Sequence, residues 1–292
     1  MIEICFLLRG QKAFSFLSGF VSTQPLPAKL TVFIDEEVNV KSEYHKSIHE
    51  LCLIHGIESY FYKFTKPDFN LYTTLVAVGW SYMVVSDRLY VIHDSILPRY
   101  RGFNPLVSAL INAENKIGAT FLKATDKVDA GPIHAQIVSE ILYPIKIQAA
   151  LEKMCQIYFK FGKELLPILF DRIRYPIREQ DEAQVSFSMW RDEDDYRIDW
   201  HQSAEEIKRF VDSVGFPYLG ASSLLNEAKV RILDSEVYPS LKIENRVPGK
   251  VFSLEGGCPV VACGTGLLKV TQLRSNTDLD LLPITKLKMR LI

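Results

Sequence analysis

Short apolar runs of strand length alternate with helical segments through the first half of this 292-residue chain. Strands are expected over residues 2–8, 30–34, 59–62, 75–78 and 89–93. Residues 42–55, between two of these runs, have the composition and spacing of a helix. Strands that alternate with helices usually pair in parallel, because each helix carries the chain back to the start of the next strand. The order therefore predicts an α/β fold with a doubly wound, mostly parallel, Rossmann-like sheet.

The same alternation continues to about residue 172. We expect a helix after Gly102 through Ala113, strands over 118–123 and 134–142, and a long amphipathic helix from 146 to about 172. The segment 175–185 is polar and charged and contains a proline, which is typical of a linker. Residues 1–180 are therefore expected to form one domain.

The pattern changes beyond residue 186. A helix over 203–214, with Ser203 as its N-cap, is expected to come first. Short strands separated by glycine and asparagine should then cover 229–233, 249–253, 260–263 and 267–272. This pattern predicts a smaller, β-rich, OB-like domain over residues 186–292, in the form of a partly open barrel.

Charge and cysteine content limit the kinds of partner. The chain has 34 Lys+Arg against 35 Asp+Glu, whereas proteins that grip nucleic acid through phosphates usually carry a basic excess. A tRNA substrate is disfavoured but stays open, because a local basic patch can lie within a neutral total. Five scattered cysteines without a CxxC pair predict free thiols in the cytoplasm and no metal site. No apolar run approaches about 20 residues, so we expect no membrane span.

The densest cluster of chemically active residues, 93–102, follows the expected strand 89–93. A second loop, 126–133, is acidic and contains Asp129. Ligands of open α/β sheets bind at the carboxyl ends of strands, where a His and an Asp on neighbouring loops can form a proton-transfer pair. Taken singly, a histidine such as His93 is more often a structural hydrogen bonder than a catalyst, and Asp129 fits an everyday turn. Arg101 could simply pair with a carboxylate that holds the loop.

Together the motifs are more specific. The pattern His-x-Ser-x-Leu-Pro-x-Tyr-Arg-Gly at 93–102, followed by Asp-x-Gly-x-Ile at 129–133, resembles the folate-dependent formyltransferase family. This family includes methionyl-tRNA formyltransferase, glycinamide ribonucleotide formyltransferase and the sugar N-formyltransferases. Residues 189–200, 215–221 and 260–264 resemble the C-terminal domain of the tRNA and sugar branches. The resemblance covers roughly residues 75–275.

The resemblance implies that a formyl group moves from 10-formyltetrahydrofolate to a primary amine without a metal. It implies that His93 lies near the formyl oxygen and stabilises the oxyanion, and that Asp129 organises the proton traffic. The residues implied for the folate pocket are Val78, Gly79, Trp80, Asp126, Val128 and Gly131. Those expected on the acceptor side are Ser95, Arg101 and Asn104. Gly79 and Trp80 equally fit an ordinary strand end with one packed aromatic ring.

One position departs from the family pattern. The family has an asparagine two residues before the histidine, and its amide donates to the formyl oxygen; here that position is Val91. Losing one such donor costs about 10²–10³ in rate. Ser95 or Asn104 could replace the donor, the enzyme could be slow, or folate binding could persist without catalysis. Asp94 is also unusual, and either caps a turn or binds a cationic amine.

The leading expectation for the acceptor is a nucleotide-linked amino sugar, as in lipopolysaccharide O-antigen biosynthesis. It rests on a tRNA-type C-terminal domain without a basic excess. Methionyl-tRNA remains an alternative because Lys286, Lys288 and Arg290 lie close together near the end of the sequence. A catalytically impaired protein that binds folate or a sugar nucleotide is the third hypothesis, and a homodimer is left open.

Overall fold

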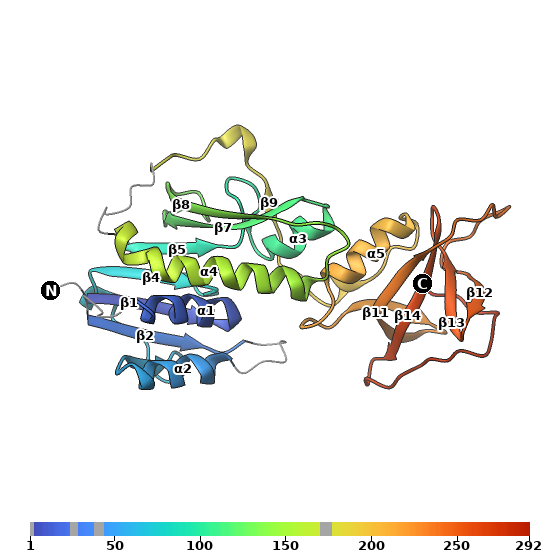
Figure 1. Ribbon diagram of the computed structural model, residues 1–292, viewed down its shortest axis with the longest axis horizontal. Coiled ribbons are helices and arrows are strands. Elements are labelled where there is room, and N and C mark those ends of the chain that lie inside the picture. Colours follow the sequence, from blue (N-terminus) through green and yellow to red (C-terminus); the bar gives the residue numbers. More distant parts are fainter. Residues whose placement is uncertain (1–2, 24–28, 38–43, 170–176) are drawn as a thin grey trace. The chain divides into compact units, whose positions relative to one another are not determined.

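The computed structural model describes residues 3–23, 29–37, 44–169 and 177–292 (Figure 1). The expected strand start at residue 2, helix start at 42, helix end near 172 and linker start at 175 fall outside these ranges. The chain divides into two compact units. The first comprises Met1–Leu106, Lys116–Ile141 and Ala150–Met189, and the second Val107–Asn115, Leu142–Ala149 and Trp190–Ile292. The domain limits expected at 180 and 186 stay a prediction.

A seven-stranded sheet forms the centre of the first unit, in the order β3-β2-β1-β4-β5-β7-β8. The strands are β1 (Glu3–Arg9), β2 (Lys29–Asp35), β3 (Glu58–Phe61), β4 (Thr74–Val78), β5 (Leu89–His93), β7 (Lys116–Lys123) and β8 (Ile133–Glu140). The first five pair in parallel, whereas β7 runs antiparallel to both β5 and β8. The mostly parallel α/β sheet expected from the sequence is confirmed.

Helices pack on one face of this sheet. They are α1 (Gly10–Val21), α2 (Tyr44–Ile54) and α4 (Ile147–Leu169); α3 (Pro105–Ile111) follows β6 (Arg101–Gly102). On this face the ring of Phe6 in β1 packs edge-on against Phe16 and Phe20 of α1. The helices α1 and α4 approach so closely that a Cβ on Gly162 would lie 2.0 Å from the Phe16 carbonyl oxygen. Sequence analysis named no helix over α1, which has no side-chain cap and no charged residue marking either end.

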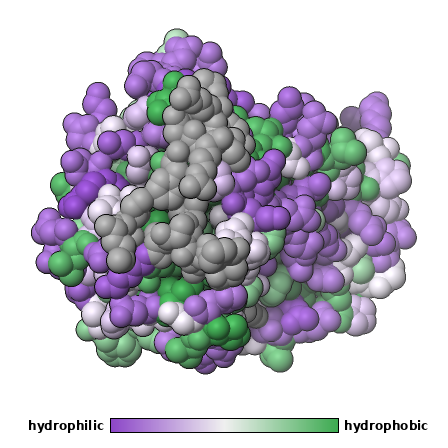
Figure 2. Space-filling model, turned by 60° about the vertical axis from the view of Figure 1, so that its left-hand side comes forward, coloured by the Kyte–Doolittle hydropathy of each residue, from purple (hydrophilic) through white to green (hydrophobic). Residues whose placement is uncertain are grey.

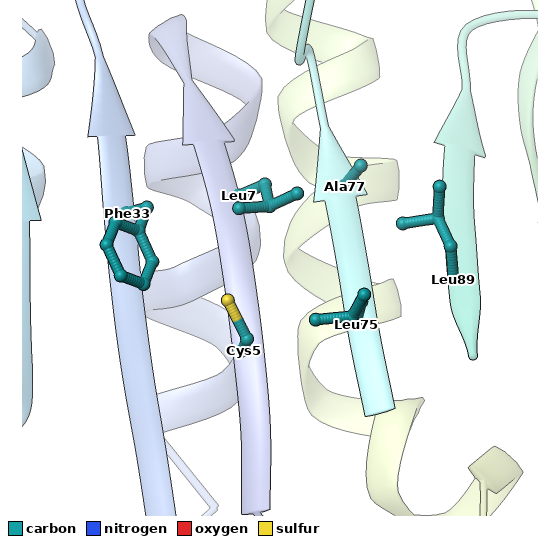
Figure 3. Packing of buried hydrophobic residues seen from close by; sticks show 6 residues of the cluster. All are labelled: Cys5, Leu7, Phe33, Leu75, Ala77 and Leu89. Atoms are coloured by element: carbon teal, nitrogen blue, oxygen red, sulfur yellow. The ribbon is translucent and has the colours of Figure 1, made fainter. Parts of the chain in front are cut away.

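The opposite face of the sheet carries a second apolar layer. Figure 3 shows its six buried side chains on one side of the strands, with the helices behind: Cys5, Leu7, Phe33, Leu75, Ala77 and Leu89. Residues from connecting segments pack over this layer, including Phe69 in the short 3-10 helix η1 (Phe69–Leu71), Val84 and Ala124. Loops therefore cover the described part of this face at the strands around β5.

The second unit contains a five-stranded antiparallel sheet in the order β10-β11-β14-β13-β12. Its strands are β10 (Ala221–Leu225), β11 (Ala228–Tyr238), β12 (Val251–Glu255), β13 (Cys258–Ala262) and β14 (Leu267–Ser275). The end of the chain joins both edges, because Ile292 exchanges hydrogen bonds with Leu224 while Leu291 donates to Gly249, just before β12. This closure agrees with the expected small barrel-like domain.

Helix α5 (Ala204–Ser213) precedes that sheet, with η3 (Asp194–Tyr196) before it. Ser203 caps α5 as expected: its hydroxyl accepts from the Glu206 amide, and the Glu206 carboxylate accepts from the Ser203 amide. Strand β10 was not expected, since its Ala-Ser-Ser start lacks the apolar alternation of a strand. The cap and most of the β pattern are thus readable from local sequence alone.

The surface is mixed in character. Figure 2 shows hydrophilic residues predominating on one face, with hydrophobic residues in small separate groups among them. The 23-residue helix α4 carries five charged side chains along its length. Within the described ranges, no helix combines the length and apolar character needed to cross a membrane.

Candidate functional site

His93 is the last residue of β5, between the parallel β4 and the antiparallel β7. Alternate residues of a strand face the same side, so His93 shares the loop-covered face with Leu89 and Val91. Its side chain is only 8% exposed. The ring lies between two partners: Nε2 is 2.8 Å from the Tyr100 carbonyl oxygen, and Nδ1 is 3.4 Å from Asp129 Oδ2. The expected His–Asp pair is therefore present.

The route by which Asp129 reaches His93 differs from the expectation. Sequence analysis placed both loops at one edge of a parallel sheet. Strand β7 is antiparallel to β5, so its last residue, Lys123, lies opposite Tyr90 near the start of β5. The β7–β8 loop therefore begins near the opposite end of β5, where the Ala124 amide donates to the Leu89 carbonyl, and Asp129 nevertheless lies beside His93.

Both nitrogens of the His93 ring face hydrogen-bond acceptors. A backbone carbonyl can only accept, so Nε2 carries the hydrogen that it donates to Tyr100. Nδ1 is then the nitrogen that can receive a proton, and the neighbouring Asp129 carboxylate would stabilise the resulting charge. Donation from Nε2 to a formyl oxygen, the role implied by the resemblance, requires Nε2 to leave Tyr100. The ring as it stands is arranged for proton transfer through Nδ1.

The Asp129 carboxylate is also held from the other motif loop. Its Oδ2 accepts from the Gly102 amide at 2.9 Å, which ties residues 93–102 to the β7–β8 loop. Asp129 adopts a positive φ of 51°, which is uncommon for a residue other than glycine. The contacts around it must offset that backbone cost. The geometry thus joins the two motifs at a single carboxylate oxygen.

Ser95 and Arg101 have structural partners. The buried Ser95 hydroxyl donates to the Arg99 carbonyl at 2.7 Å and so closes a turn within the motif. Arg101 is 4% exposed, and its guanidinium donates to Gln180 Oε1 and to the carboxylate of Glu182 in η2 (Glu182–Gln184). The hydrogen bond from Arg101 lowers the pKa of Glu182. Arg101 therefore has the loop-holding arrangement that the sequence left open as an alternative.

The residues expected to line the folate pocket lie in two groups. In the β7–β8 loop, Asp126 and Val128 are exposed, whereas Gly131 is buried so tightly that a Cβ there would lie 1.8 Å from the Lys123 carbonyl oxygen. At the end of β4, Val78 is buried, and the Trp80 ring packs against Tyr62 and Tyr82.

The strand register brings the β4 group next to His93. Val78 of β4 pairs with Ile92 of β5, and Gly79 and His93 are the residues that directly follow this pair. Gly79 there adopts a positive φ of 66°. The indole Nε1 of Trp80 is buried and has no hydrogen-bond partner among the described residues. An unused buried donor is unusual in a folded protein.

Val91 occupies an apolar position. It packs against the buried cluster of Leu97, Leu122 and Ile133, on the same face as His93. Asn104 is exposed at a positive φ of 48° just before α3, and no hydrogen bond joins it to His93 or Asp129. With Ser95 Oγ engaged in its own turn, neither of the two expected substitutes is placed as a second donor.

Asp94 points to the other side of β5. Its carboxylate pairs with Lys12 of α1 and accepts a hydrogen bond from the Tyr158 hydroxyl of α4. Tyr158 is fully buried, and its pKa is raised well above the usual value, first by burial and then by Asp94. Asp94 therefore neither caps a turn nor faces the site where it could bind an amine, because its two carboxylate oxygens contact side chains of α1 and α4.

Gln180 and Ser186 are contact residues that sequence analysis missed. Gln180 lies in the segment taken for a linker and bonds to the Asp129 loop. Ser186 comes directly after that segment, and its Oγ accepts from the Tyr100 amide. Strand β9 (Phe187–Ser188) continues this segment and pairs with β6. The sequence around these two residues is polar and gives no local signal of burial, so their role is seen only from their hydrogen-bond partners.

No cluster of three or more His, Cys, Asp or Glu side chains in the described ranges is arranged to hold a metal ion. All five cysteines are free, and burial raises the pKa of Cys5 and Cys263 to about 12. These two thiols are therefore poor nucleophiles and poor metal ligands at neutral pH.

Comparison with solved structures gives the same fold. The sugar 3N-formyl transferase WlaRD, solved in the presence of dTDP and 5-N-formyl-THF, matches with a TM-score of 0.68 at 17% identity over 92% of this chain and 97% of that one. An N-formyltransferase from Helicobacter canadensis, in complex with folinic acid and dTDP-3-aminofucose, matches with a TM-score of 0.69 at 16% identity, covering 92% and 99%. Methionyl-tRNA formyltransferase from Clostridium thermocellum matches at 0.55 with 13% identity, covering 82% and 94%.

Two family models match consecutive parts of the sequence. Residues 83–167 match the formyl transferase model, which takes in β5, His93 and the Asp129 loop. Residues 191–279 match the model of the formyl transferase C-terminal domain. Together they span more than half of the chain, in the order of the family. With the two-part fold and the His93–Asp129 pair in place, the chain belongs to the formyl transferase family.

Proposed function

We propose that the protein moves a formyl group from 10-formyltetrahydrofolate to the primary amine of a nucleotide-linked amino sugar. The observation that carries this proposal is the buried His93–Asp129 pair, whose ring nitrogen and carboxylate lie 3.4 Å apart at the end of a central strand. Two solved relatives whose ligands include a folate and a dTDP compound share the fold over nearly their whole length. Free thiols at all five cysteines support a cytoplasmic location.

The residues around β4 and β5 fit a folate donor. The unpartnered Trp80 Nε1–H offers a donor to a heteroaromatic ring, and Tyr62 and Tyr82 surround the indole with apolar surface. The exposed Asp126 and Val128 of the Asp129 loop complete the set proposed for binding. When bound, the donor supplies an activated formyl carbon whose bond to nitrogen N10 is broken in the transfer.

His93 and Asp129 would manage the protons of that transfer. As the acceptor nitrogen bonds to the formyl carbon, it must lose a proton, and Nδ1 of His93 is the ring nitrogen free to take it. Asp129 would stabilise the imidazolium, and the proton can then pass to the departing nitrogen. The transfer balances, because one C–N bond forms as another breaks and the proton lost by the acceptor nitrogen is gained by the departing nitrogen. Burial of the pair strengthens its electrostatic effect.

Charge pairing in the second unit favours a sugar over tRNA as acceptor. Three cations of this unit are engaged with its own carboxylates: Arg231 and Lys229 with Glu193, and Arg274 with Asp278. Arg246 donates to the backbone carbonyls of Cys263 and Gly266. Such cations release few counterions on binding nucleic acid.

One observation favours a second candidate, a protein that binds folate without rapid transfer. Val91 lies in an apolar cluster, and Nε2 of His93 is committed to Tyr100, so the described site offers no side-chain donor to an oxyanion at either position. We rank active transfer first, because losing one donor among several lowers a rate by about 10²–10³ without abolishing it.

The test measures formyl transfer with 10-formyltetrahydrofolate and a panel of acceptors: dTDP- and UDP-linked 3-amino and 4-amino sugars, and methionyl-tRNA. We expect product with at least one sugar nucleotide and none with tRNA. Product with tRNA alone would move the assignment to the tRNA branch. Calorimetric folate binding with no product on any acceptor would establish the second candidate, and a folded protein that binds no folate would refute both.

A further inference from the structure

The segment between residues 178 and 188 lies against both motif loops. Its backbone pairs with β8 at Ile133 through Arg178 and with β6 through β9. Its side chains reach inwards at Gln180, which is 9% exposed although its neighbours at 179 and 181 are exposed. A buried polar side chain within an exposed polar tract must find partners, because burying an amide without hydrogen bonds is destabilising.

The amide of Gln180 bonds to both motif loops. Its Nε2 donates to the backbone carbonyls of Asp129 at 2.7 Å and Gly131 at 2.8 Å. Its Oε1 accepts from Nε and Nη2 of Arg101 at 3.1 and 3.0 Å. Both hydrogens and both lone-pair directions of the amide are thereby used. One side chain therefore joins the loop that carries Asp129 to the motif that follows His93.

We propose that Gln180 is a positioning residue that holds the Asp129 carboxylate against His93. This inference rests on the proposed function, in which Asp129 acts through the ring. Asp129 is held by two hydrogen bonds: Gln180 donates to its backbone carbonyl, and the Gly102 amide donates to its carboxylate. Gly102 is itself paired with β9. The first hydrogen bond comes from the 178–188 segment, and the second depends on it through β9.

A backbone at positive φ explains why such a hold is needed. Asp129 has φ 51°, a conformation that persists in a residue other than glycine only where the surroundings impose it. Without the two bonds from Nε2, the loop would relax towards ordinary φ values and carry the carboxylate away from Nδ1. A shift of about 1 Å in a catalytic group can cost about 10² in rate.

Glutamine is the side chain that this position requires. Glutamate has the same length and still accepts from Arg101, but it cannot donate to the carbonyls of Asp129 and Gly131. Methionine has a similar shape and neither donates as glutamine does nor accepts as strongly. Two substitutions of nearly constant volume thus separate the hydrogen bonds of Gln180 from its packing.

The experiment compares Gln180→Met with Gln184→Met. Gln184 lies in the same segment but is exposed, and among the described residues its amide bonds to the exposed Asp181, so it is a matched control. We expect Gln180→Met to lower kcat about 10–100-fold, with the KM for the acceptor little changed. Gln184→Met should match wild type. Combined with Asp129→Ala, Gln180→Met should cause no further loss, because its effect passes through Asp129.

Hydrogen exchange supplies a readout that needs no turnover. Amides of residues 124–132 should exchange faster in Gln180→Met than in wild type or Gln184→Met. If Gln180→Met does not fold, Gln180→Glu takes its place with the same expectations. An unchanged kcat, unchanged exchange, or a loss that adds in full to that of Asp129→Ala would overturn the proposal. Full activity in Asp129→Ala itself would instead refute the catalytic assignment.

Discussion

The two faces of β5 are built differently although their residues alternate along one strand. On the helix face, Ile92 and Asp94 meet α1 and α4, and the Tyr158 hydroxyl bonds to both residues. On the loop face, Val91 and His93 meet connecting segments held by hydrogen bonds between distant residues. The helix face is closed by apolar packing, whereas the loop face carries the polar His93–Asp129 pair. Substitutions on the helix face are therefore expected to change mainly the stability of the fold, and substitutions on the loop face mainly the rate of the reaction.

The largest effect is expected from removing the pair on the loop face. His93→Ala and Asp129→Ala should each lower kcat by about 10²–10⁴ while folate affinity changes far less, because both groups act on the transition state. Steady-state kinetics and calorimetry measure this. Asp87→Ala, a 92% exposed carboxylate before the start of β5, is the control and should match wild type. Equal turnover in His93→Ala and wild type would remove the ring from the mechanism.

The helix face should respond in stability and not in chemistry. Gly162→Ala introduces a Cβ that would lie 2.0 Å from the Phe16 carbonyl oxygen, so α1 and α4 must move apart. We expect a loss of about 1–3 kcal/mol in the free energy of unfolding, with turnover per folded molecule retained. Gly215→Ala, whose added Cβ would meet nothing closer than 3.5 Å, should be neutral in the same urea titration. A large fall in kcat at unchanged stability would contradict the separation of the faces.

Val91→Asn should affect both properties of the loop face. An amide among Leu97, Leu122 and Ile133 loses apolar packing and should cost about 1–3 kcal/mol of stability. The same amide restores the family's donor, so the rate should rise or remain similar. Kinetics and denaturant unfolding are measured together, with Val91→Ala as the control that removes packing without adding a donor. Transfer that appears only in Val91→Asn would identify the natural protein as a binder that has lost its reaction.

The smallest effect is a pH dependence on the helix face. His134 of β8 packs edge-on against the rings of Tyr90 and Phe121, and burial, with a contribution from Lys123, lowers its pKa. The unfolded chain therefore binds more protons than the folded one as the pH falls from about 6.5 towards the folded pKa. Stability should decline across that interval, and His134→Gln should decline less. Melting temperatures between pH 7.5 and 5.5 test this, and identical pH profiles would refute it.

Much of the fold could be predicted because its signals are local. Buried strands such as β1 and β4 appear as short apolar runs, and Ser203 with Glu206 forms a capping box within four residues. The element missed most clearly, α1, begins without a cap and is stabilised by contacts with β1 and α4. Strand β10 was missed for a related reason, since its small polar residues are buried only by their neighbours.

The residues of the site likewise divide into those that local sequence identified and those that only tertiary contacts revealed. His93 and Asp129 were identified from spaced motifs, which mark residue types without placing them. Arg101 was expected near the acceptor but is held by Gln180, 79 positions along the chain. No property of the sequence around Gln180 distinguishes it from the exposed Gln184. Its role depends on partners that folding brings together.

The sequence by itself determined much of the order of strands and helices, the family and the two residues of the proposed reacting pair. These are properties of periodicity and of short motifs, which act over a few residues. Only the tertiary structure decided that β7 runs antiparallel to β5, that Asp94 faces the helices, and that an apparent linker holds the Asp129 loop. Strand direction and side-chain partnership follow from packing and hydrogen bonds between residues far apart in the chain. Local composition carries no record of those partners.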